Sequence, residues 1–129
     1  IGKPRTILII DDNAEHRGFL REMLDLLDFI VKEAKSGEEA LQVVQETWPD
    51  LILVDVFMPG IDGFETTRSI RTLANPAPVS IIAISASPEM QQASLAAGCD
   101  DFLVKPIQID HLFQCLGQYL QLEWKFIGS

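Results

Sequence analysis

Three short, predominantly apolar runs constrain the fold of this chain more than any other feature of its sequence. They cover Thr6–Ile10, Leu51–Val54 and Val79–Ile84. Each contains β-branched residues, and none alternates between apolar and polar positions as a strand with one solvent-exposed face would. Strands that are apolar at every position are usually buried on both faces in a parallel sheet covered by helices. The runs therefore predict strands of such a sheet.

Helical patterns separate these runs, and weaker strands are expected at residues 29–34 and 102–104. Five strands alternating with five helices predict an α/β fold with helices on both faces of the sheet. The residues expected to cap the helices are Asn13, Ser36 with Glu39, Asp62 with Glu65, Ser87 before Pro88, and Gly98 at a helix end. The residues expected to face inward are Phe19, Leu20, Met23, Leu24, Leu27, Ala40, Leu41, Val44, Trp48, Phe64, Thr67, Ile70, Ile109, Leu112, Phe113, Leu116 and Tyr119.

The length and charge of the chain exclude several classes of protein. Its 129 residues suit one domain, which buries roughly two-thirds of its unfolded surface. Ten Lys and Arg against 19 Asp and Glu give a net charge of −9, so direct binding to nucleic acid is not expected. No apolar run approaches the ~20 residues of a membrane span. Cys99 and Cys115 fit reduced thiols, and we expect a cytoplasmic domain without membrane contact.

Polar residues stand where the predicted strands end: Asp11 and Asp12, then Asp55, Ser85 and Lys105. Each residue alone fits a turn or a solvated charge. The carboxyl ends of parallel strands meet at one edge of the sheet, however, and ligands bind in the crevice there.

Three carboxylates at that edge would repel one another unless a cation lay among them. Oxygen ligands without His or Cys indicate Mg²⁺ or a similar hard ion rather than zinc, and Mg²⁺ commonly binds beside phosphate. A hydroxyl and an ammonium facing the same point suit the oxygens of a phosphoryl group. The sequence therefore predicts a site that accepts phosphate on a carboxylate, with Asp55 as the nucleophile.

These residues, in this order and spacing, resemble the receiver domain of the response regulators of two-component signalling. The resemblance extends from about Arg5 to Tyr119. It implies a flavodoxin-like (βα)5 three-layer sandwich with a five-stranded parallel sheet of order 2-1-3-4-5. The matching segments are residues 9–13, 36–41, 49–55, 58–59, 62–63, 85–86, 97–98 and 104–106.

The resemblance assigns a role to each residue of the site. Asp55 would be the phosphoacceptor, attacking a phosphohistidine of a partner kinase. Asp12, Asp55 and the backbone carbonyl of Phe57 would ligate Mg²⁺ directly, and Asp11 would act through a bound water. Lys105 would pair with Asp55 and then with the phosphoryl oxygens.

The resemblance also implies a conformational switch. Ser85 would hydrogen-bond the phosphoryl group, and Phe102 would rotate inward in response. The peptide bond before Pro106 would be cis. Phe57 is apolar where a polar side chain can orient the hydrolytic water in this family, so we expect slow self-dephosphorylation. His16, on the surface of the first helix, is expected to face solvent and is assigned no role.

The implied partner is the dimerisation and phosphotransfer domain of a histidine kinase, or a histidine phosphotransfer protein. We expect residues 1–129 to form a single receiver domain, with a core of about 5–119 and a tail or linker of 120–129. The tail contains Trp124, and the chain begins with Ile1 rather than Met. These features resemble receiver modules inside hybrid histidine kinases, the parent protein that we expect, with a free-standing regulator as the alternative.

Two other classes of function, a protein-interaction module and an enzyme of similar architecture, fit the sequence less well. A degenerate receiver, acting only as a protein-interaction module, would have lost Asp55, Asp12 or Lys105, and all three are present. An aspartyl-phosphate phosphatase of similar architecture would need a second Asp where Phe57 stands. A flavin protein would need a Thr-, Ser- or Gly-rich loop where acidic residues follow the first strand. We therefore expect a phosphoacceptor switch that catalyses its own phosphorylation rather than a turnover enzyme.

Overall fold

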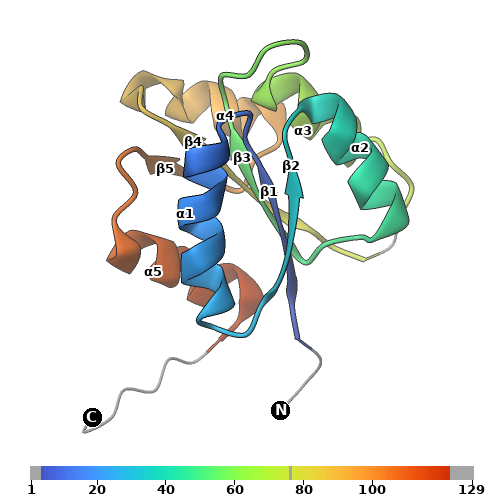
Figure 1. Cartoon of the computed structure of the whole chain (residues 1–129). Helices are drawn as coiled ribbons and strands as arrows, with labels where there is room; N and C mark the ends of the chain where they lie inside the picture. The colour runs from blue at the N-terminus through green and yellow to red at the C-terminus, as the bar shows by residue number, and fades with distance from the viewer. Residues whose placement is uncertain (1–3, 76, 123–129) are drawn as a thin grey trace, which may run out of the picture.

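Strands and helices alternate along the chain in the computed structural model, which describes residues 4–75 and 77–122. All neighbouring strands are parallel, and their order is β2-β1-β3-β4-β5. This order confirms the predicted flavodoxin-like topology (Figure 1). The elements are β1 (Thr6–Ile10), α1 (Ala14–Asp25), β2 (Ile30–Ala34), α2 (Gly37–Glu46), β3 (Leu51–Asp55), α3 (Gly63–Arg71), β4 (Ser80–Ser85), a 3₁₀ turn (Pro88–Met90), α4 (Gln91–Ala97), β5 (Asp101–Val104) and α5 (Ile109–Leu120).

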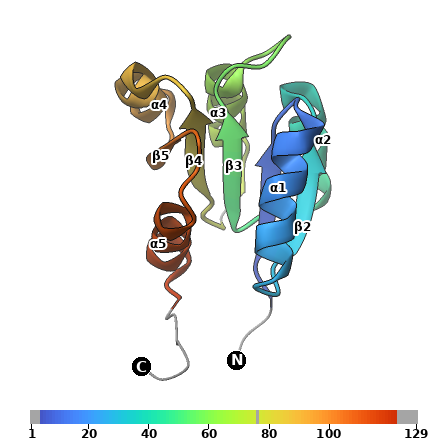
Figure 2. The same ribbon diagram turned by 60° about the vertical axis from the view of Figure 1, so that its left-hand side comes forward.

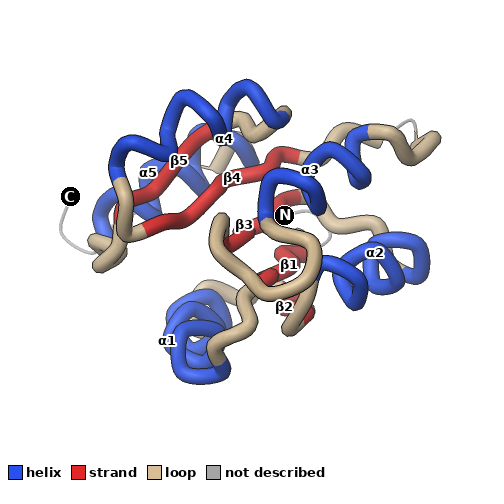
Figure 3. The backbone as a smooth tube through the Cα atoms, turned by 90° about the horizontal axis from the view of Figure 1, so that it is seen from above, coloured by secondary structure: helices blue, strands red, loops and turns tan. Residues whose placement is uncertain are grey.

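Helices cover both faces of the sheet and give the molecule three layers (Figures 2 and 3). Helices α1 and α5 pack on one face, where Leu20, Leu24, Leu112 and Leu116 are buried among strand residues. We call this cluster the α1/α5 core. Helices α2, α3 and α4 cover the opposite face and enclose a second cluster, the α2/α3/α4 core.

Consecutive residues of the central strands point into opposite cores. In β1, Ile7 and Ile9 lie in the α1/α5 core, whereas Leu8 and Ile10 lie in the α2/α3/α4 core. All four side chains are fully buried. Strands β3 and β4 alternate in the same way. Because successive strand side chains point to opposite faces, burial of both faces requires an apolar residue at every position.

Side-chain caps define the starts of the first three helices as predicted. The Asn13 side chain accepts hydrogen bonds from the N–H groups of Glu15 and His16, at 2.9 and 3.1 Å. The side chains of Ser36 and Asp62 accept from the N–H groups three residues later, at 3.1 and 2.9 Å. Gly98 ends α4 with a φ of 112°, a left-handed conformation that glycine adopts without strain.

The predicted start of the fourth helix is wrong in its detail. The Ser87 side chain makes no capping hydrogen bond, and the first turn after it is a 3₁₀ turn that begins at Pro88. Helix α4 starts only at Gln91. The Oγ atom of Ser85 instead accepts from the Ser87 N–H group at 3.1 Å, so this segment is fixed from the strand end.

Two of the residues predicted to face inward are exposed. Phe19 is 49% exposed and Ile109 is 48% exposed. Leu20 and Leu24 already fill the inward stripe of α1, and Leu112 is fully buried in α5. The other predicted inward residues are buried or pack against one of the two cores.

The end of α5 folds back onto the domain. Gln121 has a left-handed φ of 56°, and the Leu122 N–H group donates to the carbonyl of Gly117 at 3.0 Å. Leu122 packs against the α1/α5 core. The rest of the predicted tail, residues 123–129, lies outside the described residues. Among the helices that the structure describes, none has the length and apolar character needed to cross a bilayer.

Gly63, where α3 meets the end of β3, should tolerate no side chain. A Cβ atom there would lie 2.4 Å from the carbonyl oxygen of Asp55 and 2.9 Å from the Cα of Val56, and both neighbours are backbone atoms. We expect Gly63→Ala to lower the free energy of unfolding in urea by about 1–3 kcal/mol.

The matched control is Gly18→Ala, in the middle of α1, where a Cβ would meet no atom within 4 Å. This substitution should raise stability by about 0.5–1 kcal/mol, because alanine is the better helix former. Equal stability of the two variants would contradict the close contact at Gly63.

Candidate functional site

The register of the sheet brings four polar residues to one edge. Ile10 of β1 pairs with Val54 of β3, so the next residues, Asp11 and Asp55, lie side by side. On the other side of β3, Asp55 pairs with Ile84 of β4, which directly precedes Ser85. The N–H group of Lys105 donates to the carbonyl of Ser85 at 2.9 Å, which continues the pairing of β4 and β5. The parallel register alone therefore gathers residues from four strands.

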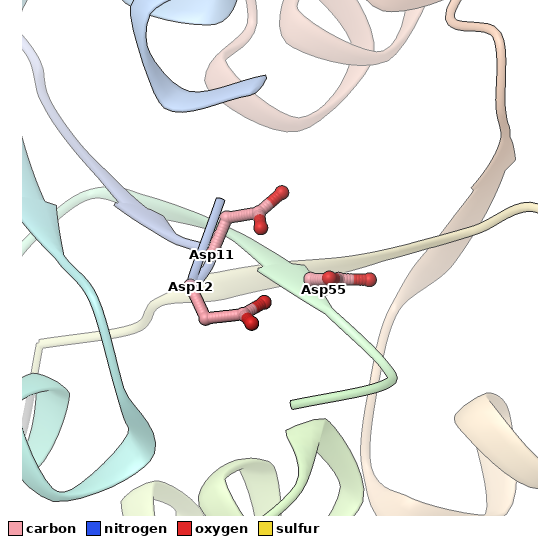
Figure 4. Close-up of side chains that lie close together, drawn as sticks. All are labelled: Asp11, Asp12 and Asp55. Atoms are coloured by element: carbon pink, nitrogen blue, oxygen red, sulfur yellow. The ribbon is translucent and has the colours of Figure 1, made fainter. Parts of the chain in front are cut away.

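Three carboxylates converge at this edge (Figure 4). One carboxylate oxygen from each of Asp11, Asp12 and Asp55 lies within 4.8 Å of the others. Asp11 is only 4% exposed and Asp55 is 8% exposed, whereas Asp12 is open to solvent. A set of hard oxygen donors, one of them facing water, fits a Mg²⁺ ion that keeps several water ligands.

Burial and neighbouring charge set the protonation of Asp55. Burial, and after it the nearby Asp11 carboxylate, are the main causes that raise the pKa of Asp55 from its ordinary 3.8 to about 6. The Lys105 ammonium and a hydrogen bond from the Phe57 backbone lower the pKa, but they do not offset the other two effects. In the absence of a metal ion, this carboxylate is therefore costly to ionise.

Lys105 lies across the site from these acids. Its Nζ atom is 3.7 Å from Asp55 Oδ1 and 3.7 Å from Asp11 Oδ2. The peptide bond that joins Lys105 to Pro106 is cis. Phe57 follows Asp55 in the loop that leads to α3, and its ring is 57% exposed.

His16 is the residue of this site that sequence reasoning missed. Its Nδ1 atom lies 3.1 Å from Lys105 Nζ and 3.6 Å from Asp11 Oδ2. The His16 side chain is 49% exposed, which confirms that it faces solvent, but these contacts also place its ring at the site. No local pattern could have shown the contact with Lys105, because the two residues are 89 positions apart. The available signal was topological, since α1 begins directly after the acidic end of β1.

The two residues expected to form the switch are both buried. Ser85 is fully buried. Phe102 is 8% exposed and packs in the α2/α3/α4 core. The side chain of Phe102 is thus packed in the interior of the domain. A phenylalanine ring carries no hydroxyl that would lose a partner on burial, so no polar cost opposes this position.

An open groove of about 390 Å³ continues from the site over α1. Asp11, His16 and Lys105 line its polar end. Its apolar part is lined by Phe19, Leu20, Ile84, Ala86, Pro106 and Ile107. The exposed ring of Phe19 therefore belongs to the wall of this groove, which accounts for its departure from the predicted inward position.

The chain matches the family model described as the response regulator receiver domain over residues 7–117. Response regulator MprA of Mycolicibacterium vanbaalenii is 35% identical over 109 residues, which are 84% of this chain and 47% of that protein. Sensor histidine kinase RcsC of Salmonella typhi is 36% identical over 115 residues, which are 89% of this chain and 12% of that protein. The chain thus spans about half of the first relative and a small part of the second.

Two solved structures are similar in both sequence and fold. The receiver domain of sensor histidine kinase PA1611 from Pseudomonas aeruginosa, solved with a magnesium ion in its active-site cleft, is 30% identical with a TM-score of 0.84. The match covers 92% of this chain and 99% of that chain. A chain from the Saccharomyces cerevisiae complex of the histidine phosphotransfer protein Ypd1 with the Ssk1 receiver domain is 28% identical, with a TM-score of 0.84 and coverage of 98% and 97%.

The raised pKa of Asp55 predicts how stability changes with pH in metal-free protein. Because the folded pKa of about 6 lies above the ordinary 3.8, the stabilisation from Asp55 is complete below about pH 4 and is lost as the pH rises through 6. Asp55→Asn has no carboxylate to ionise. With EDTA near neutral pH, its free energy of unfolding should exceed that of the wild type by about 1–3 kcal/mol.

Urea titrations at several pH values test this prediction. The difference between Asp55→Asn and the wild type should shrink toward about pH 4, where both side chains are neutral. Added Mg²⁺ should shrink it at neutral pH, because the ion binds the ionised wild-type site. A difference that stayed constant across this pH range would show that ionisation of Asp55 does not cause it.

Proposed function

Because the chain belongs to the response regulator receiver domain family, we propose that it accepts a phosphoryl group on Asp55 and so acts as a conformational switch in a phosphorelay. One observation carries the proposal. The buried carboxylate of Asp55 lies within 4.8 Å of two further carboxylates, with the Lys105 ammonium 3.7 Å away. This arrangement suits a nucleophile that needs a cation to remain ionised.

The proposed reaction transfers the phosphoryl group from nitrogen to oxygen. A carboxylate oxygen of Asp55 attacks phosphorus, the bond from phosphorus to the histidine nitrogen of the donor breaks, and an acyl phosphate forms. Asp12, Asp55 and the Phe57 carbonyl would hold Mg²⁺ directly, and Asp11 would hold it through a water. The ion, when bound, supplies positive charge to the transferring oxygens.

The remaining polar groups would bind the product. The ammonium of Lys105 is placed to pair with a phosphoryl oxygen once Asp55 is modified. Ser85 Oγ accepts from the Ser87 N–H group, which leaves its own O–H free to donate to a phosphoryl oxygen. Since Phe102 is already buried, we propose that the switch begins with Ser85 and the segment after it, and that Phe102 supports this segment from the interior.

The proposed phosphodonor is a histidine kinase phosphotransfer domain or a histidine phosphotransfer protein. The groove beside Asp11 and Lys105 is open to a partner and offers Phe19 and Ile107 as apolar contacts. The similarity to a chain from a complex that contains such a phosphotransfer protein supports this partner. Small phosphodonors would reach Asp55 by the same opening, so the domain would catalyse its own phosphorylation.

We propose that residues 5–119 form the receiver core, with 120–129 as a tail or linker in a hybrid histidine kinase. The match to a sensor histidine kinase supports this parent, and the match to MprA supports the alternative of a separate response regulator. The free, buried Cys99 and Cys115 fit a cytoplasmic setting. A degenerate receiver is not supported, because Asp12, Asp55 and Lys105 are all in place.

Phosphorylation by acetyl phosphate tests the proposal. Incubation with this donor and Mg²⁺ should add the mass of one phosphoryl group to the intact wild-type chain. Asp55→Asn should gain nothing, because an amide is not a nucleophile under these conditions. Omission of Mg²⁺ should also abolish the gain.

The matched control is Asp28→Asn, the same chemical change at a position with a φ of 63° that asparagine tolerates. This variant should be phosphorylated like the wild type. A phosphate gain that survives in Asp55→Asn would place the acceptor elsewhere, and no gain in the wild type would favour a domain that only binds proteins.

The phosphoryl group should be lost slowly, because the side chain two residues after Asp55 has no polar atom. Phe57 is 57% exposed, so a substitution there should leave the fold intact. We expect Phe57→Asn, which can hold a water near the phosphoryl group, to shorten its lifetime several-fold after the donor is removed. Intact mass followed over time measures this, and a wild-type half-life of seconds at neutral pH with Mg²⁺ would contradict it.

A further inference from the structure

The shortest side-chain contact of Lys105 is with His16. Lys105 Nζ lies 3.1 Å from His16 Nδ1, compared with 3.7 Å from the nearest oxygens of Asp11 and Asp55. An ammonium group only donates hydrogen bonds, so Nδ1 must accept. The tautomer that makes this hydrogen bond carries its proton on Nε2.

The backbone around His16 is tied to the acidic end of β1. The Asn13 side chain accepts from the His16 N–H group at 3.1 Å, and the Asn13 N–H group donates to Asp11 Oδ1 at 2.9 Å. The first turn of α1 and the carboxylate of Asp11 are thus fixed by the same residue. His16 is held at the site by its backbone, although its ring is half-exposed.

We propose that His16 is a positioning residue for Lys105 in the phosphorylation of Asp55, an inference that rests on the proposed function. The ammonium lies within hydrogen-bond distance of His16 and within ion-pair distance of Asp11 and Asp55. The hydrogen bond to His16 keeps the Lys105 ammonium from forming a close ion pair with either Asp11 or Asp55. The ammonium is thereby placed for an incoming phosphoryl oxygen.

The physical gain is preorganisation. A lysine side chain loses rotamer entropy when its ammonium group is fixed in one position. Because His16 Nδ1 already binds the ammonium in the free protein, part of this entropy is lost before the phosphodonor binds. Loss of the acceptor should therefore slow the phosphoryl transfer without removing any group that bonds to phosphorus.

The initial rate of phosphorylation by acetyl phosphate with Mg²⁺, measured by intact mass, tests the role. His16→Ala should be slower than the wild type by about threefold to tenfold, the scale of one hydrogen bond. His16→Asn should recover most of the rate, because its Oδ1 replaces Nδ1 as an acceptor. Urea unfolding would verify that both variants fold, and Mg²⁺ affinity should be unchanged in both.

A double-mutant cycle separates this role from a general structural one. In a Lys105→Met background, His16→Ala should cause no further loss of rate, since the group that it positions is gone. The inference is overturned if His16→Ala slows that background by the same factor, if His16→Asn is as slow as His16→Ala, or if Mg²⁺ affinity falls with the rate.

Failure of the inference is distinct from failure of the proposed function. A wild type that is phosphorylated at the same rate as His16→Ala overturns only the role of His16. A wild type that gains no phosphate overturns the proposed function and this role together.

Discussion

Burial of the sheet on both faces is the constraint on which the rest of the structure depends. Every side chain of β3 from Leu51 to Asp55 is buried. Within such a strand, a polar side chain would have neither water nor a partner. Chemistry is therefore confined to the edge where the strands end. The parallel register then decides which polar residues meet there, and it selects Asp11, Asp55, Ser85 and Lys105.

The edge of the sheet is a compromise between stability and reactivity. Burial and the Asp11 charge disfavour ionised Asp55, and Lys105 offsets only part of that cost at 3.7 Å. A closer ion pair would stabilise the free domain more strongly, but it would also occupy the carboxylate that has to react. The structure keeps the ammonium near three acceptors without a close bond to either buried acid. A site that departs from the best local pairing is typical of functional regions.

The sequence was most informative where the pattern is local or periodic. The apolar runs, the caps at Asn13 and Asp62, and the acids at the strand ends all follow from short-range chemistry. Together they predict a parallel sheet covered by helices and the edge of the site, whereas the strand order is predicted only from the resemblance to receiver domains. The contact of His16 could not be predicted in this way, because its partner Lys105 follows β5, 89 positions away. Phe19 has the spacing of a core residue, and only the shape of the groove beside it explains its exposure.

The alternation along β1 has a consequence for how this domain can change over evolution. Ile9 and Ile10 are neighbours in the chain, yet they belong to different cores separated by the sheet. Substitutions that do not share contacts act nearly independently on stability. Substitutions in the α1/α5 core, beside the groove, can therefore accumulate and change which partners the groove recognises. The packing of the α2/α3/α4 core need not change with them.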